Sequence, residues 1–364
     1  MKKVHIYILL AIIAIILLVI FLIPNFVATQ SVADTATTTV EKVEQAVVVP
    51  VPTLDKVLYD QKLLALANIT IATTTSSSTK KIATSTTKAK SLWPVKTVYP
   101  NAGALLPFNR IVAYYGNFYS TKMGVLGQYP APQMLKMLIG EVDKWQLADP
   151  TTPVIPAIDY IAISAQGAPG ADGMYRSRMP AGQIQKAIDL ANQVHGIVFL
   201  DIQVGKSSVQ TEVPLLEKYL KLPNVHLALD PEFSMATSGK KPGTIIGTMD
   251  ASSINFAADF LAKIVRENNL TPKILVVHRF TGHMVTNAEN IIPLPEVQVV
   301  MDMDGWGGKP NKTKAYKDVI YEEPVQFTGL KLFYKNDLLP PSTGMLSISQ
   351  VLNFKPIPSY IQYQ

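Results

Sequence analysis

Two acidic residues at the end of a short strand are the part of this sequence best suited to chemistry. Asp230 and Glu232 follow the strand candidate 225–229, and side chains two apart in an extended chain point to the same side. Carboxyl groups held this close repel each other when ionised, so one keeps its proton near neutral pH. A protonated carboxyl beside an ionised carboxylate is the arrangement that hydrolyses glycosidic bonds.

Other apolar runs end in acidic residues or in histidine in the same way. The side chains concerned are Asp159, Asp201, His278, Asp302 and Asp304. If these runs are parallel strands of one barrel, their ends meet at its C-terminal mouth, where barrel enzymes hold their active sites. We expect Glu232 to act as general acid, with Asp230 tuning its charge. Asp302 or Asp201 is expected to act as base or nucleophile.

Aromatic side chains near the same strand ends suit a substrate that contains sugar rings, because aromatic faces offer flat apolar platforms. On the first strand, Tyr114 and Gly116 are expected on the inward face. The residues expected to bind substrate are Tyr114, Tyr115, Asp159, His278, Asp304, Trp306 and Tyr334. This interpretation includes no metal ligand and no cofactor.

Strands and helices alternate from residue 98 onward, which predicts parallel βαβ units. Strands are expected at 111–115, 154–158, 197–201, 225–229, 274–277, 297–301, 330–334 and 360–363. Helices are expected at 132–147, 180–194, 209–222, 252–268, 312–322 and 348–353, with a short one at 284–290. Eight such strands fit an α/β fold of the (β/α)8 TIM-barrel type. The alternative is a doubly wound open sheet, but residues 115–119 lack the Gly-rich turn expected after its first strand.

Composition excludes several classes of function. The sequence contains no cysteine, which excludes disulfides and thiolate chemistry. The net charge of +6 is carried mostly by the first 99 residues, which hold ten Lys and five acids. The remaining chain is nearly neutral, so the protein lacks the basic surface of a nucleic-acid-binding domain.

The N-terminal residues 1–24 have the pattern of a membrane anchor. Lys2 and Lys3 precede an apolar run over residues 6–23, which is near the length that crosses a bilayer as a helix. The lysines favour an orientation that places the rest of the chain outside the cytoplasm, at the cell surface. A cleaved signal peptide is the alternative.

Residues 25–98 are expected to form a Thr/Ser-rich linker, because residues 70–90 cannot bury a core. Within this linker, residues 54–69 carry apolar side chains at helical spacing and are expected to form a transient helix. The TIM-barrel domain is then expected to span residues 99–364.

Several motifs of the barrel region resemble an uncharacterised family of exported bacterial proteins. They are residues 200–205, 229–232, 276–280, 301–305 and 331–334. A weaker resemblance is to muramidase-type lysozymes, barrel enzymes with an Asp-x-Glu pair on the fourth strand, which Asp230 and Glu232 match. That resemblance implies hydrolysis of a cell-wall or extracellular glycan. Those enzymes also carry an acid on the first strand, where this sequence has none at residues 113–116.

Two alternatives stay open. His278 and His283 lack the spacing of a His-Glu-x-x-His metal motif, but His278 together with Asp302, Asp304 and Glu232 could bind a divalent ion for a metal-dependent hydrolase. The same mouth could also bind polysaccharide without catalysis. The expected partners are therefore a glycan, and the membrane through the N-terminal helix.

The anchor and linker generate a prediction about topology. Protease added to intact cells should release a fragment that begins at about residue 70, because exposed Thr/Ser-rich segments are preferred cleavage sites. Immunoblotting of the supernatant would detect it. Recovery of the intact chain from the cytoplasm would contradict the proposed orientation.

Overall fold

A computed structural model describes residues 52–68 and 92–364 of this chain. The predicted anchor at 1–24 and most of the predicted linker lie outside the described residues. None of the helices in the described part of the chain combines the length and the apolar character that a membrane span requires. The boundary predicted between linker and barrel therefore stays a prediction.

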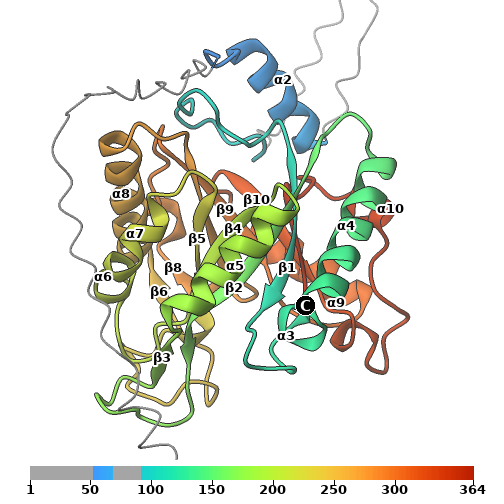
Figure 1. The fold of residues 1–364 in the computed structure, drawn as a ribbon. Helices are drawn as coiled ribbons and strands as arrows, with labels where there is room; N and C mark the ends of the chain where they lie inside the picture. The colour runs from blue at the N-terminus through green and yellow to red at the C-terminus, as the bar shows by residue number, and fades with distance from the viewer. Residues whose placement is uncertain (1–51, 69–91) are drawn as a thin grey trace, which may run out of the picture. The chain divides into compact units, whose positions relative to one another are not determined.

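Eight parallel strands close into a barrel (Figure 1). In spatial order they are β1 (Arg110–Gly116), β2 (Val154–Ala165), β4 (Ile197–Ile202), β5 (Val225–Leu229), β7 (Lys273–Arg279), β9 (Val297–Met303), β10 (Phe327–Leu332) and β11 (Tyr360–Tyr363). Each strand pairs in parallel with the next, and β11 pairs in parallel with β1. The closure confirms the predicted TIM barrel and excludes the open sheet.

Helices cover the outside of the barrel. The regular ones are α4 (Ala131–Ala148), α5 (Ala181–Gln193) and α8 (Ala251–Glu267), and shorter ones are α3 (Val125–Gln128), α9 (Lys309–Tyr316) and α10 (Ile348–Val351). The helix predicted at 209–222 is divided into α6 (Val209–Glu212), η1 (Val213–Leu216) and α7 (Glu217–Leu220). Pro214 lies at this division, where a proline removes a backbone donor. The helix predicted at 312–322 ends in one π-helical turn, η5 (Lys317–Tyr321).

The helix predicted at 284–290 is wrong. These residues form parts of η3 (Gly282–Met284), β8 (Val285–Thr286) and η4 (Ala288–Asn290), and β8 pairs with β6 (Met249–Asp250). Asn287 has a φ of 54° in the left-handed region, which a continuous right-handed helix cannot contain. The connection from β7 to β9 therefore contains no α-helix.

The two faces of β1 are reversed relative to the prediction. Ile111 and Ala113 belong to the cluster inside the barrel, whereas Val112 and Tyr114 pack in the outer cluster between strands and helices. Every residue of β1 is buried. Because both faces of β1 are buried, its sequence does not show which face lies inside the barrel. The prediction that Tyr114 lies on the inner face was wrong.

The end of the barrel where the strands begin is covered by α2 (Lys56–Ala67), which lies within the predicted linker (Figure 1). The Ile357 amide donates to the Leu66 carbonyl at 2.7 Å, and Lys62 Nζ donates to the Thr151 carbonyl at 3.0 Å. Tyr59 is buried beside the interior cluster, with its ring 6.0 Å from that of Phe108. The predicted helix therefore forms, but it packs on the barrel and is not the transient linker helix that was expected.

Tyr59 tests whether α2 belongs to the folded unit. Tyr59→Ala should lower the free energy of unfolding by about 3–5 kcal/mol, as for other large aromatic truncations in a core. Tyr59→Phe is the matched control, because the Tyr59 hydroxyl is buried without a hydrogen-bond partner in the described residues, and its removal should leave stability unchanged or increase it. Urea denaturation would measure both. Equal stabilities of the two variants would show that α2 is not part of the cooperative unit.

Candidate active site at the barrel mouth

A pocket of about 410 Å³ opens at the C-terminal mouth of the barrel. The carboxyl groups of Asp230, Glu232 and Asp304 line it, and so does the basic side chain of Lys331. Aromatic side chains complete the wall: Tyr115, Phe233, Phe280, Trp306 and Phe333. Two of the predicted catalytic residues therefore share one pocket with three of the residues predicted to bind substrate.

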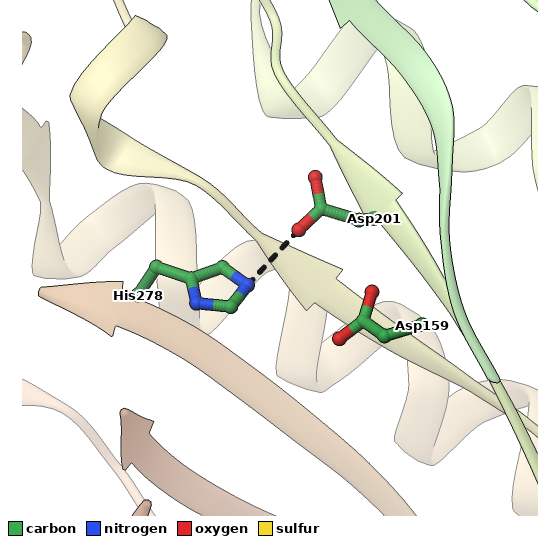
Figure 2. A group of neighbouring side chains, drawn as sticks. All are labelled: Asp159, Asp201 and His278. Atoms are coloured by element: carbon green, nitrogen blue, oxygen red, sulfur yellow. Dashed lines mark hydrogen bonds and ion pairs between the residues drawn. The ribbon is translucent and has the colours of Figure 1, made fainter. Parts of the chain in front are cut away.

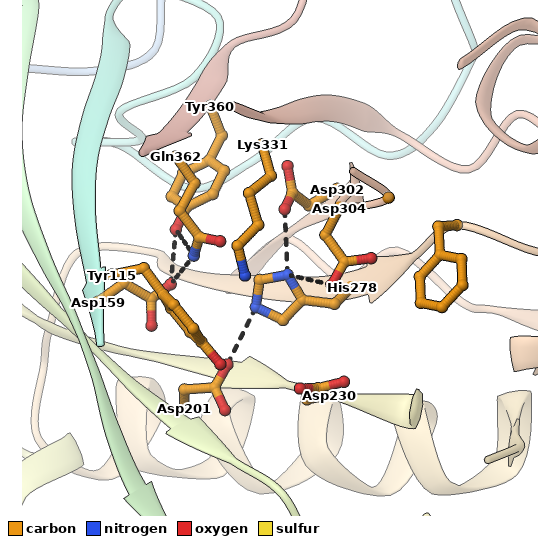
Figure 3. A network of polar contacts seen from close by, with 12 residues as sticks. Tyr115, Asp159, Asp201, Asp230, His278, Asp302, Asp304, Lys331, Tyr360 and Gln362 are labelled. Atoms are coloured by element: carbon orange, nitrogen blue, oxygen red, sulfur yellow. Dashed lines mark hydrogen bonds and ion pairs between the residues drawn. The ribbon is translucent and has the colours of Figure 1, made fainter. Parts of the chain in front are cut away.

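A second layer of polar side chains lies deeper and does not line the pocket. Its members are Asp159, Asp201, His278 and Asp302, each fully buried with 0% exposure (Figure 3). The two layers follow from the strands. Residues two further along the inward face of β4, β7 and β9 are Gln203, Phe280 and Asp304, and these do line the pocket.

Asp230 is held by two hydrogen bonds at the end of β5. Its Oδ1 accepts the backbone N–H of Glu232 at 3.1 Å, which caps the 3-10 turn η2 (Pro231–Phe233). Its Oδ2 accepts from Gln203 Nε2 at 3.1 Å. Burial, followed by the charge of Asp201, raises the pKa of Asp230 well above its usual range. Asp230 therefore positions the backbone that carries Glu232.

Glu232 is the pocket carboxyl best suited to hold a proton near neutrality. Burial, followed by repulsion from Asp304, raises the pKa of Glu232 from 4.5 to about 7, against the opposing influence of Lys331 and His278. Asp304, rather than the predicted Asp230, is therefore the carboxylate whose charge most raises the Glu232 pKa. A carboxylic acid with this pKa is matched to general acid catalysis.

His278 is clamped between carboxylates of β9, the strand next to β7, and β4, which lies two strands away on the other side (Figure 3). Its Nε2 lies 3.0 Å from Asp201 Oδ2, and its Nδ1 lies 3.0 Å from Asp302 Oδ2 and 3.8 Å from Asp304 Oδ2. Burial lowers the pKa of His278, but the hydrogen bonds to Asp201 and Asp302 raise it well above its usual value. With this placement, Asp201 and Asp302 hold His278 beneath the pocket, and neither of them lines the pocket.

Asp159 lies on the other side of the deep layer. Its Oδ2 accepts from the Tyr360 hydroxyl at 2.6 Å and from Gln362 Nε2 at 2.8 Å. Burial, followed by the charge of Asp201, raises the pKa of Asp159 to about 7. This side chain supports the interior of the barrel and does not line the pocket, in contrast to its predicted contact with substrate.

Lys331 is a site residue that sequence reasoning missed. It is buried, and its Nζ lies 3.6 Å from the centroid of the Tyr115 ring in a cation–π contact. Lys331 is the only charged residue of β10, and Gln362 lies between apolar and aromatic residues of β11. A polar residue within a buried strand can indicate a site residue, but the prediction considered only acidic residues at strand ends.

The predicted aromatic residues divide into two groups. Tyr115 and Trp306 line the pocket, and Trp306 is 61% exposed. Tyr114 and Tyr334 instead pack together outside the barrel wall, with their hydroxyl oxygens 3.1 Å apart. The structure does not bring these two tyrosines to the acids, because the side chain of Tyr114 points toward the helices.

Comparisons with known proteins give distant structural matches. No family model matches the sequence, and no curated protein matches it. A ruminal GH26 endo-beta-1,4-mannanase is similar in structure, with 9% sequence identity and a TM-score of 0.34 over 70% of this chain. This chain spans 58% of the mannanase's length. The cellulose synthase subunit Z of Clostridioides difficile matches with 11% identity and a TM-score of 0.36, over 70% of this chain and 92% of that protein.

The raised pKa of Glu232 predicts a pH-dependent stability. Its folded-state value of about 7 exceeds the ordinary value of 4.5, so between these values the folded protein binds the proton more tightly than the unfolded chain does. This stabilisation is complete below the lower value and is lost as the pH rises through about 7. Glu232→Gln, which stays neutral, should therefore gain stability relative to the wild type between about pH 4 and about pH 8. Urea denaturation across this range would measure it, and a constant difference would contradict the raised pKa.

Proposed function

We propose that the barrel is a glycoside hydrolase acting on a cell-wall or extracellular glycan. The observation that carries the proposal is the pairing of Glu232, with its pKa of about 7, and Asp304 in one open pocket at the barrel mouth. Glycosidic bond hydrolysis needs one carboxyl that donates a proton and a second that is ionised. An extracytoplasmic location is part of the proposal and is supported by the anchor pattern of residues 1–24.

In this mechanism, Glu232 donates its proton to the oxygen of the departing sugar. Asp304 is the ionised partner and acts as base or nucleophile, a role that replaces the earlier assignment to Asp302 or Asp201. Burial raises the pKa of Asp304 above its usual value, and the positive charges of His278 and Lys331 oppose this rise by favouring its ionised form. His278 is held in place for this by Asp201 and Asp302.

The pocket walls suit a carbohydrate ring. Trp306 and Phe280 provide apolar surface beside the acids, and an exposed indole such as that of Trp306 offers a platform on which a sugar can stack. Gln203 and Asn336 add amide groups to the same wall, and amides can bond to sugar hydroxyls in either direction. The combination of flat apolar and small polar groups is typical of sites that bind neutral sugars.

Glu232→Gln tests the catalytic assignment. The variant keeps the size of the side chain and removes the proton, so the rate of hydrolysis should fall by about 100- to 10,000-fold. In the wild type, activity should decline above pH of about 7 as Glu232 ionises. Release of reducing ends from peptidoglycan, chitin, mannan and cellulose fragments would measure both.

Glu267→Gln is the matched control, because Glu267 ends α8 at the opposite end of the barrel and its side chain is 55% exposed. This control should retain wild-type activity. Near-full activity in Glu232→Gln would show that Glu232 is structural. If the wild type binds a fragment of this panel but hydrolyses none, the barrel is a polysaccharide-binding module.

A further inference from the structure

Three side chains from separate strands converge beneath the pocket floor. Asp159 on β2, Asp201 on β4 and His278 on β7 each offer one ligand atom, and these atoms all lie within 4.8 Å of one another. Figure 2 shows the two carboxyl groups and the imidazole directed toward a common space. All three residues are 0% exposed. Two carboxylates and one imidazole are a donor set that binds divalent transition metals.

Unsatisfied oxygen atoms point to a missing positive partner. Oδ1 of Asp159 and Oδ1 of Asp201 are buried and have no hydrogen-bond partner among the described residues. A buried polar atom without a partner costs free energy, more so when it carries charge. The second oxygen of Asp159 is fixed by Tyr360 and Gln362, which leaves Oδ1 free to bind an ion.

His278 is oriented as a metal-binding histidine would be. Its Nδ1 lies 3.0 Å from Asp302 Oδ2, and histidines that bind metal through one nitrogen usually donate the other N–H to a carboxylate. Its Nε2 faces Asp201 at 3.0 Å, so a metal ion would replace the proton between these two groups. Asp302 thus acts on the site through His278.

The surrounding charge also favours a cation. Five buried carboxyl groups meet around His278, namely Asp159, Asp201, Asp230, Asp302 and Asp304. Two buried basic side chains, His278 and Lys331, face them. Like charges in a region of low dielectric repel strongly, so the deep layer requires additional positive charge, which protons or a metal ion can supply.

We propose that Asp159, Asp201 and His278 bind a divalent transition metal ion, such as Mn²⁺, Fe²⁺ or Zn²⁺. Neighbouring ligand atoms of a tetrahedral ion with bonds of about 2.1 Å lie about 3.4 Å apart. The present spacings, which are at most 4.8 Å, therefore need to close by no more than about 1.4 Å. Ca²⁺ fits poorly, because it requires roughly six to eight oxygen ligands. The ion would lie below Tyr115 and Lys331, so it stabilises the mouth without touching a substrate. This inference is independent of the proposed hydrolysis.

Metal binding can be tested on the full chain in mild detergent. After incubation with Mn²⁺, Co²⁺ or Zn²⁺ and gel filtration, elemental analysis should find one ion per chain, and the melting temperature should rise with metal concentration. Co²⁺ bound to imidazole and carboxylate would give a visible absorption spectrum that differs from that of aqueous Co²⁺. Retention of no ion with any of these metals would overturn the proposal.

Variants separate specific ligation from general charge attraction. Asp302→Asn should weaken the affinity for the metal ion by about 10- to 100-fold, as for other carboxylates that orient a metal-binding histidine. The single variant Asp159→Asn, which removes a ligand, should weaken this affinity more than Asp302→Asn does. Asp230→Asn is the matched control, since it alters a buried carboxyl group of the same mouth that is not a proposed ligand, and it should retain the ion. Equal losses in Asp159→Asn and Asp230→Asn would contradict the ligand set. Glu232→Gln should retain the ion while losing hydrolysis, so failure of either proposal leaves the other testable.

Discussion

The clamp of His278 between Asp201 and Asp302 is the interaction on which the rest of the mouth depends. It joins β4, β7 and β9 across the barrel interior through two contacts of 3.0 Å. Breaking either contact would leave a fully buried charge without its partner, which is strongly destabilising. Because the clamp uses both carboxylates, these acids are fixed as supports. The pocket above is left with Asp230, Glu232 and Asp304.

The clamp also sets the charge of the pocket. Burial raises the pKa of Glu232 and of Asp304, with added repulsion from Asp304 on Glu232 and from Asp302 on Asp304, whereas His278 lowers both values. Asp304 lies 3.8 Å from His278 and has Lys331 and Lys312 among its stabilising charges. Glu232 is influenced more by the repulsion of Asp304 than by either cation. Two carboxyl groups in one pocket thereby differ in how readily they ionise, which is how acid and base roles are assigned in such sites.

The sequence predicted all eight barrel strands, because each contains a short apolar run and most of these runs are separated from the next by a helix-forming segment. It also placed Asp201, His278 and Asp302 on inward faces correctly, since a polar residue interrupts an otherwise apolar face. It failed for Tyr114, where both faces of β1 are apolar and buried. Lys331 and Gln362 were not predicted, because they are not acidic and lie within their strands, whereas the prediction rested on acids at strand ends.

The alternation of side chains along a strand predicts which face a residue is on, but not how deep in the barrel it lies. Residues two apart share a face but lie roughly 6.6 Å apart along the barrel axis before tilt is considered. Asp302 and Asp304 have the same residue type and the same face, yet Asp302 is enclosed with His278 and Asp304 lines the pocket. The same step separates Asp201 from Gln203 and His278 from Phe280. Which acid lines the pocket is therefore decided by its depth along the strand. Tyr115 and Lys331, which contact each other and line the pocket, lie on β1 and β10, two strands without an acidic residue.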